Sequence, residues 1–401
     1  MTGTVFTGHE PGSSAYRRLF AGLFCAGIAT FAQLYAPQAV LPQIAADLRV
    51  PPATAALAVS AATLGLAAAV VPWSLVADRI GRVPAMAVGV IIATAFGVGA
   101  ICTSDLALLL VLRLGEGIGL GAVPAVALVY LSEEVAGRHT AAAAGGYIAG
   151  TTVGGLSGRL IAGPVGEIGG WRIGIAATIV VCAIAAAAFL LLVPRARGFV
   201  PGRRRIDRGP GILARLAAPL RSARQRTLYL QGFLLMGAFV AVYNYLGFHL
   251  AAPPFLLPVW AVSLLFLAYP AGTVSSPWAG ALASRHGRYR VLIGSVIVAA
   301  VGAGMLAVPA TPVIVLGLVV FTAGFFGAHA VASGWTPVAA PEGSRAQASS
   351  LYYLGYYGGS SLFGWLLGYV FGGAGWGWFV TTIIALIAVA GVAAAVVLRE
   401  R

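Results

Sequence analysis

The side chains best suited to proton chemistry are a carboxylate and a guanidinium inside one long apolar run. Glu116 lies about ten residues into the run 106–131, and Arg113 precedes it by three positions. In a helix, this spacing places both side chains on one face. Burial favours the neutral form of a carboxylate, whereas a neighbouring cation favours its ionised form. We therefore predict that Glu116 loads and releases a proton, and that Arg113 is its electrostatic partner or a tether to backbone carbonyl groups. A static ion pair, or exposure of Glu116 at a helix kink, stays open.

Two other ionisable side chains lie within apolar runs, and each has two interpretations. Arg159 comes late in the run 141–165, where a long side chain can reach the interface; otherwise it contacts an anionic ligand or locks an outer gate. His329, in the run 312–338, is either a hydrogen-bonded contact between helices or a proton relay, because the pKa of histidine lies near physiological pH. Both alternatives remain open for each residue.

The elements that must hold these side chains are helices that span a membrane. The chain has 401 residues, of which 60% are hydrophobic and 9% charged, and its mean hydropathy is +0.93. A soluble domain carries about 25% charged residues, and a helix needs about 20 apolar residues to cross the bilayer core. We expect an all-α integral membrane protein with twelve such runs. They are 16–36, 54–76, 84–102, 106–131, 141–165, 172–193, 227–250, 257–281, 290–308, 312–338, 346–371 and 376–397.

A polar loop that occurs twice predicts that the helices form two repeated halves. The copies are Asp78-Arg79-Ile80-Gly81-Arg82 and Ser284-Arg285-His286-Gly287-Arg288, with matching glycines 206 positions apart. Three further pairs lie 205 positions apart: Gly150 with Gly355, Gly154 with Gly359, and Trp171 with Trp376. Repeated halves are typical of membrane carriers. We expect a tail over 1–15, six-helix bundles over 16–193 and 227–397, a basic linker over 194–226, and a tail over 398–401.

The arginines predict the orientation of the chain in the membrane. With both termini in the cytoplasm, 21 of the 25 arginines fall on the inner side and two on the outer side, as the positive-inside rule requires. Ten lie in the linker, so the net charge of +14 reports topology, and no nucleic-acid partner is expected. Residues 211–225 are either an amphipathic helix on anionic lipid of the inner leaflet or a solvated segment.

Twelve helices, two halves and the repeated loop together resemble the major facilitator superfamily, whose loop pattern is Gly-x-Leu-x-Asp-Arg-x-Gly-Arg-Lys. The first copy departs from it at Ser74 and Val83, and the second has Ser284 in the acidic position. A loop carboxylate can cap the next helix and pair with arginine across the two halves. We interpret the loops as an inner gate latch, which Glu133 and Glu134 complete. The gate residues are Asp78, Arg79, Gly81, Arg82, Arg285, Gly287 and Arg288.

Two motifs are similar to those of drug:proton exchangers in this superfamily. The run 141–165 holds Gly146-x-x-x-Gly150-Thr151-x-x-Gly154-Gly155, with Thr where the exchangers have Pro. The run 106–131 holds Arg113-x-x-Glu116-Gly117-x-Gly119, with Glu where Gln is usual, and the resemblance implicates its Arg in proton coupling. Small residues at this spacing let helices approach closely, so we expect Gly146, Gly150, Gly154 and Gly155 to form a packing motif that limits leak between the halves. Stretches such as Tyr130-Leu131-Ser132-Glu133-Glu134 look like the YnfM-type bacterial efflux branch.

The resemblance also implies a set of cavity residues, because the first, fourth, seventh and tenth segments line the central cavity in this superfamily. Tyrosine and asparagine there offer flat apolar area with a few hydrogen bonds, which suits amphipathic ligands. An aromatic belt at the membrane interface is the alternative. The candidates are Phe31, Gln33, Tyr35, Tyr243, Asn244, Tyr245, Arg159, Tyr352 and Tyr356.

The sequence contains no ATP-binding loop, no His/Cys metal cluster and no Ser-His-Asp arrangement, so we expect no enzyme activity and no cofactor. The leading hypothesis is a monomeric exporter of small molecules in a bacterial cytoplasmic membrane. It is driven by protons that Glu116, Arg113 and His329 handle. One alternative is a uniporter or importer of a sugar or organic anion bound by Arg113 or Arg159. The other, from a different class, is a non-transporting membrane sensor or scaffold.

Overall fold

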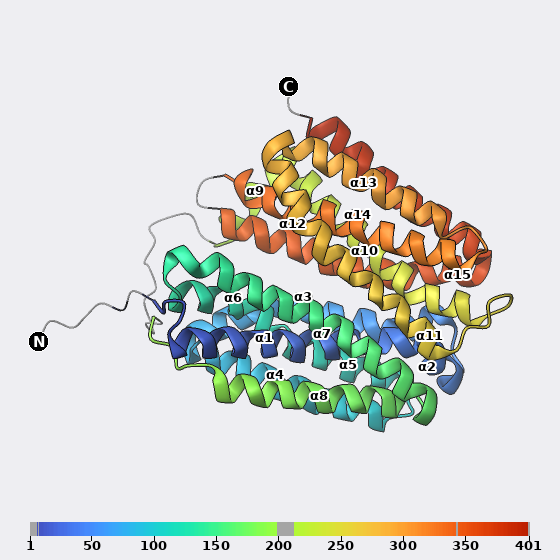
Figure 1. Ribbon diagram of the computed structural model, residues 1–401, viewed down its shortest axis with the longest axis horizontal. Coiled ribbons are helices and arrows are strands. Elements are labelled where there is room, and N and C mark those ends of the chain that lie inside the picture. The colour runs from blue at the N-terminus through green and yellow to red at the C-terminus, as the bar shows by residue number, and fades with distance from the viewer. Residues whose placement is uncertain (1–5, 7, 199–211, 342–343, 400–401) are drawn as a thin grey trace, which may run out of the picture. The chain divides into compact units, whose positions relative to one another are not determined.

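The computed structural model describes residues 6, 8–198, 212–341 and 344–399, which are almost entirely helical (Figure 1). Ten described segments are long and apolar enough to cross a membrane. One of them, Gln347–Val397, holds two helices joined at Gly375, whose φ of 79° interrupts the helical backbone. When that segment is divided and the 30-residue helix Thr140–Gly169 is added, the described residues contain the twelve membrane-length helices that the sequence predicts.

The contacts within the chain group it into two compact units. Unit 1 comprises Met1–Gln43 and Ala61–Asp207, and unit 2 comprises Ile44–Ser60 and Arg208–Arg401. Residues 44–60, which the sequence assigns to the first bundle, thus group with unit 2. The helix that begins at Pro52 explains this grouping, because its first turn packs closely against residues of unit 2. A Cβ atom at Gly368 of unit 2 would lie only 2.6 Å from Cα of Ala53. The linker boundaries at 194 and 226 stay a prediction.

The helices of the first half begin and end at polar or glycine residues. They are α1 (Ser14–Tyr35), η1 (Ala36–Val40), α2 (Leu41–Leu48), α3 (Pro52–Ile80), α4 (Arg82–Cys102), α5 (Leu106–Leu120), α6 (Ala122–Glu134), η2 (Gly137–His139), α7 (Thr140–Gly169) and α8 (Trp171–Leu192). The carboxylate of Asp105 caps α5 by accepting a hydrogen bond from the backbone N–H of Leu108 at 2.7 Å, as expected for an N-cap. In unit 1, α1 packs along α7 and α8, and α4 packs against α5 (Figure 1).

The helices of the second half repeat this plan with different lengths. They are α9 (Ile212–Arg221), α10 (Ala223–Ala251), α11 (Val259–Leu264), η3 (Leu265–Ala268), α12 (Tyr269–His286), α13 (Arg288–Met305), α14 (Thr311–Val338) and α15 (Arg345–Val397). Helix α10 packs against α15, and α14 packs against α12 and α13. A helix therefore occupies part of the predicted amphipathic segment 211–225, while residues 199–211 of the linker lie outside the described residues.

Matching glycines make matching contacts in the two units, which supports the predicted repeat. A Cβ atom at Gly154 of α7 would lie 2.7 Å from Cα of Ile28 in α1, and one at Gly359 of α15 would lie 2.8 Å from Cα of Phe233 in α10. Both members of the second pair lie 205 positions after those of the first. Because such distances leave no room for a side chain, each glycine lets two helix backbones touch.

Two of the other predicted packing glycines of α7 also face α1, whereas a Cβ atom at Gly155 would meet only the Arg159 side chain of its own helix. A Cβ atom at Gly150 would lie 2.8 Å from Cα of Phe24, and one at Gly146 would clash with the ring of Phe20. Gly146, Gly150 and Gly154 therefore pack a pair of helices inside unit 1. This differs from the sequence-based expectation, which placed their packing partner in the other half of the chain.

Candidate functional site

A buried ion pair on α5 is the centre of the candidate site. Nη1 of Arg113 donates to Oε2 of Glu116 at 2.5 Å, and the two side chains are only 3% and 2% exposed. Nη2 of Arg113 donates to the backbone carbonyl of Leu34 at 2.8 Å. The guanidinium therefore serves both predicted roles at once, as the partner of Glu116 and as a tether to a backbone carbonyl. Neither charge reaches the surface of the protein.

Gln33 of α1 joins the ion pair to a third helix. Its side-chain amide hydrogen-bonds the Glu116 carboxylate and donates to the carbonyl of Ala93 in α4 at 2.8 Å. Gly97 makes room for this arrangement, because a Cβ atom there would clash with Nε2 of Gln33 and lie 3.3 Å from Oε1 of Glu116. The sequence assigned Gln33 to the ligand cavity, whereas in the structure its amide contacts the carboxylate that we expect to carry the proton.

Arg159 of α7 is also buried, with 1% of its surface exposed. Its Nε and Nη2 donate to Oε1 of Gln38 at 2.8 and 2.5 Å, and Nη1 donates to the carbonyl of Gly155. The ring of Tyr35 lies 4.6 Å from the guanidinium carbon, within the range of a cation–π contact. The guanidinium thus does not reach outward to the interface. Gln38 went unrecognised in the sequence because it lies beyond the predicted end of the first apolar run.

His329 of α14 lies in an aromatic cluster within unit 2. Its Nδ1 shares a hydrogen bond with the hydroxyl of Tyr352 at 2.9 Å. Its ring lies 4.7 Å from that of Tyr356 and 6.0 Å from that of Phe325, between ring centroids. The structure therefore contains the predicted contact between helices, and it brings His329, proposed for proton handling, together with Tyr352 and Tyr356, both proposed for the ligand cavity.

The polar groups of α10 that the sequence assigned to the cavity are buried and bonded. The hydroxyl of Tyr243 shares a hydrogen bond with that of Thr322 at 2.8 Å. The amide of Asn244 and the hydroxyl of Tyr245 both donate to the carbonyl of Gly364, at 3.1 and 2.9 Å. All three side chains are at most 4% exposed, so an aromatic belt facing lipid does not describe them. Their polar atoms hold α10 against α14 and α15.

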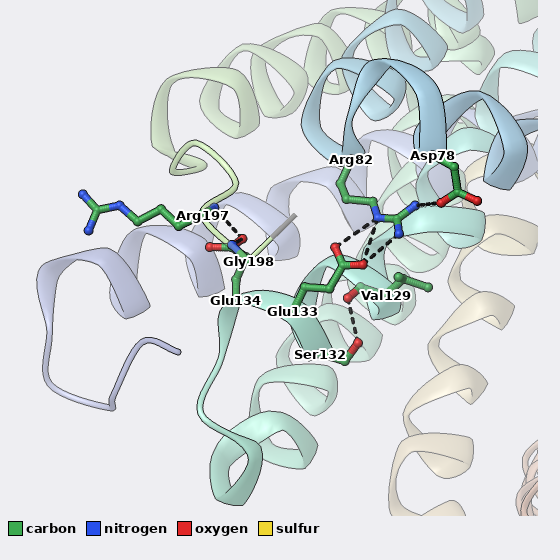
Figure 2. A network of polar contacts seen from close by, with 8 residues as sticks. All are labelled: Asp78, Arg82, Val129, Ser132, Glu133, Glu134, Arg197 and Gly198. Atoms are coloured by element: carbon green, nitrogen blue, oxygen red, sulfur yellow. Dashed lines mark hydrogen bonds and ion pairs between the residues drawn. The ribbon is translucent and has the colours of Figure 1, made fainter. Parts of the chain in front are cut away.

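The first repeated loop forms a network of ion pairs in unit 1 (Figure 2). Nη1 of Arg82 contacts Oδ1 of Asp78 at 2.5 Å, while Nη2 and Nε contact the carboxylate of Glu133 at 2.7 and 3.0 Å. Gly81 has a φ of 100°, which glycine adopts without strain, and Arg79 is exposed. Glu133 therefore joins the loop as predicted, and Arg82 is held by carboxylates from two elements.

Glu134, the neighbour of Glu133, faces a different part of unit 1 (Figure 2). Its buried carboxylate accepts hydrogen bonds from the backbone N–H groups of Arg197 and Gly198, both at 2.6 Å. Its backbone carbonyl accepts a hydrogen bond from the N–H of His9 at 2.7 Å. The sequence-based expectation had included Glu134 in the latch network, but this side chain instead holds the start of the linker, while its backbone holds the N-terminal tail.

The second repeated loop lacks such a network in the described part of unit 2. Arg285 and Arg288 are exposed, and neither has an ion pair or hydrogen bond with a described side chain. Ser284, in the position of Asp78, donates its hydroxyl to the carbonyl of Gly280 at 3.1 Å. Gly287 repeats the backbone of Gly81 with a φ of 86°. Among the described residues, no cluster of three His, Cys, Asp or Glu side chains could hold a metal.

Known proteins resemble this chain in sequence and in fold. A model of the Major Facilitator Superfamily matches residues 19–259. The inner membrane transport protein YnfM of Escherichia coli (strain K12) is 36% identical over 367 residues, which cover 91% of this chain and 87% of YnfM. The structure of the nucleoside transporter NupG covers 96% of this chain and 100% of NupG, with a TM-score of 0.72 and 15% identity. That of the xylose transporter XylE from E. coli covers 95% and 97%, with a TM-score of 0.73 and 13% identity. At such identities the two structures report on the fold, and they confirm the predicted helical membrane architecture.

Proposed function

Since the chain belongs to the Major Facilitator Superfamily, and is therefore a multi-pass membrane transporter and not an enzyme, we propose that it exports small amphipathic molecules in exchange for protons. Members of this family bind small molecules and are generally monomeric. We place the chain in a bacterial cytoplasmic membrane with both termini inside. The name of its relative YnfM and the distribution of its arginines support this placement.

The observation that carries the proposal is the buried Arg113–Glu116 pair with its ties to α1. A carboxylate without access to water is costly inside a membrane and marks a functional site by default. Here the carboxylate has one cationic partner at 2.5 Å and one amide partner, Gln33. The pair is thus closed in this conformation, and a change in the protonation of Glu116 alters the charge balance of three helices.

Protonation of Glu116 is the step that drives the exchange. A neutral carboxyl group no longer balances Arg113, and a buried charge left without its partner is strongly destabilising. The conformation with the closed pair therefore loses stability relative to one in which Arg113 meets water or a ligand. A substrate that prefers one of these states competes with the proton, which is the condition for coupling. Export follows when the proton enters from outside.

A second candidate is the uniport or import of a sugar or organic anion. The nucleoside and xylose transporters that share this fold favour it, because their substrates are polar. Arg159 would supply the anion contact, since its guanidinium lies against the ring of Tyr35 and could exchange Gln38 for a carboxylate. Saturable uptake that resists an uncoupler would favour this candidate over proton exchange.

The test is proton flux in proteoliposomes with an imposed pH gradient. Lipophilic cations, neutral drugs and sugars are added in turn to the wild type, Glu116→Gln and Glu167→Gln. The last variant removes an exposed carboxylate from the end of α7 and serves as the matched control. We expect a substrate to collapse the gradient in the wild type and in Glu167→Gln, but not in Glu116→Gln.

Each other outcome identifies a different mechanism. Collapse in all three proteins would keep the exchange but move the proton site, and His329→Gln would then be compared. Transport of a substrate without any collapse would establish the second candidate. Full proton-driven export by Glu116→Gln would refute the role given to the ion pair.

A further inference from the structure

We propose that α12, α13 and α14 form a binding site for one anionic phospholipid, with its phosphate at Arg285 and Arg288 and an acyl chain in the groove above them. The site lies within unit 2 and is independent of the transported substrate. Its arginines belong to the repeated loop that the sequence assigned to an inner gate, but in this proposal their partner is a ligand from outside the protein.

The groove is the first observation. It has a volume of about 370 Å³ and is lined almost wholly by apolar atoms of the three helices. Trp278 and Leu282 of α12 and Val298 of α13 form part of its walls and are 70%, 45% and 42% exposed. Among the polar lining groups, Ser275 donates its hydroxyl to a carbonyl of its own helix. The groove therefore offers an apolar ligand a surface that is almost wholly apolar, although Ser295 also lines it.

The two arginines continue the walls of the groove. Trp278, Leu282 and Arg285 are spaced i, i+4, i+7 along α12, so they share one helix face. Arg288 lies three positions before Val291, which lines the groove on α13. Both cationic side chains thus begin at the mouth of the groove, one on each flanking helix.

The length of the groove matches one leaflet of a membrane. From Arg288 to Val298 is ten residues of helix, or about 15 Å at 1.5 Å per residue. The apolar core of a bilayer is about 30 Å thick, so one leaflet takes half of it. An acyl chain that follows the groove from the arginines would thus end near the middle of the bilayer.

The excess of positive charge in this part of the chain determines which class of lipid headgroup would bind. In the first loop, Arg82 is neutralised by Asp78 and Glu133. In the second loop, serine replaces the aspartate. Residues 208–401 contain 11 arginines and only two carboxylates, Glu342 and Glu400, neither of them among the described residues.

An external anion can supply the missing negative charge. Basic clusters at the cytoplasmic ends of membrane helices attract anionic headgroups. A free anion would gain only the contact with the arginines, which salt screens at an exposed site. A phospholipid also buries apolar surface in the groove. The combination of a basic mouth and an apolar groove therefore selects a lipid.

Native mass spectrometry of the purified full-length protein tests the site, with dioleoyl phosphatidylglycerol and dioleoyl phosphatidylcholine titrated separately. We expect the wild type to bind phosphatidylglycerol more tightly. The double variant Arg285→Gln/Arg288→Gln should bind it about 25-fold more weakly, at about five-fold for each arginine, and bind phosphatidylcholine as before. The matched control is Arg226→Gln, which removes the same charge from an exposed position near the start of α10, a helix that does not line the groove, and should leave the preference intact.

A second pair of variants tests the groove itself. Nothing lies within 4 Å of a Cβ atom built at Gly294, which lines the groove, or at Gly304, which does not. Gly294→Leu should fill the groove and weaken the binding of both lipids, whereas Gly304→Leu should not. Elution as a single monodisperse peak by size-exclusion chromatography checks that each variant is folded.

Four results would overturn the proposal. The first is equal binding of the two lipids by the wild type. The second is an equal loss in Arg226→Gln and in the double variant, which would assign the effect to net charge alone. The third is displacement of phosphatidylglycerol by inorganic phosphate, which would identify a free anion as the ligand. Unchanged binding by Gly294→Leu would likewise remove the acyl chain from the groove.

Discussion

Removing one partner of the Arg113–Glu116 pair should destabilise the protein more than removing both. The two side chains are 3% and 2% exposed and in contact at 2.5 Å. Breaking a buried ion pair from one side costs about 3–5 kcal/mol, because a charge is left without compensation. Here each partner keeps a polar contact, Arg113 with Leu34 and Glu116 with Gln33. We therefore expect Arg113→Gln and Glu116→Gln each to lose about 3 kcal/mol, the lower end of that range.

The double variant Arg113→Gln/Glu116→Gln should lose less than either single variant, because two neutral amides can hydrogen-bond each other. The coupling between the two sites is then at least about 3 kcal/mol, or about two powers of ten in the unfolding equilibrium. Equilibrium unfolding in mixed micelles of rising SDS content, followed by tryptophan fluorescence, measures all four proteins. As a control, Glu10→Gln removes an exposed ion pair and should leave the midpoint unchanged.

Additive losses in this cycle would refute the reasoning. They would mean that Arg113 and Glu116 are not energetically coupled, so that protonation of the carboxylate could not act through the guanidinium. The same cycle also serves the transport assay, because it separates a variant that cannot couple protons from one that is merely less stable.

Two further outcomes follow from contacts in unit 1. Gly154→Ala should be about 1–3 kcal/mol less stable than Gly145→Ala, because the new Cβ atom at Gly154 meets the backbone of Ile28, whereas nothing lies within 4 Å of one at Gly145. Both substitutions raise helix propensity by the same amount. Equal stability of the two variants in SDS would contradict the contact with Ile28. The hydrogen bond from Arg138 lowers the pKa of Glu10, so this attachment of the tail should hold at neutral pH and be lost as pH falls below the usual glutamate pKa of about 4.3 and through the lowered value. Hydrogen exchange of residues 8–13 measures this loss, and protection that persists well below that pH would argue against it.

The apolar runs and the helical spacing predicted much of the fold and part of the site. Charge is scarce in membrane helices, so Glu116 and Arg113 stood out, and their i,i+3 spacing predicted the contact that the structure contains. The repeat of 205 positions predicted which glycines would make matching contacts. These features follow from local periodicity, which one sequence displays directly.

The partners of these residues depend on tertiary contacts that the periodicity of one helix does not report. Gln33 was assigned to a cavity because nothing in α1 shows that its amide meets Glu116 and Ala93. The bond from Arg159 to Gln38 depends on how α7 rotates against the segment after α1. The carboxylate of Glu134 binds backbone N–H groups of the linker. Because almost every residue carries a backbone N–H group, the sequence does not indicate which ones a carboxylate will bind.

The repeat preserves the scaffold but not the chemistry, and this asymmetry constrains the mechanism. The positions 205 after Arg113 and Glu116 are Leu318 and Phe321, both fully buried in the packing of α14. The ion pair therefore has no counterpart there, whereas the glycine contacts of α7 recur in α15. A cycle in which each half carries its own proton on equivalent carboxylates cannot be built from these residues. On the proposed function, proton binding thus acts through unit 1, and unit 2 must respond through conformational change and ligand contacts.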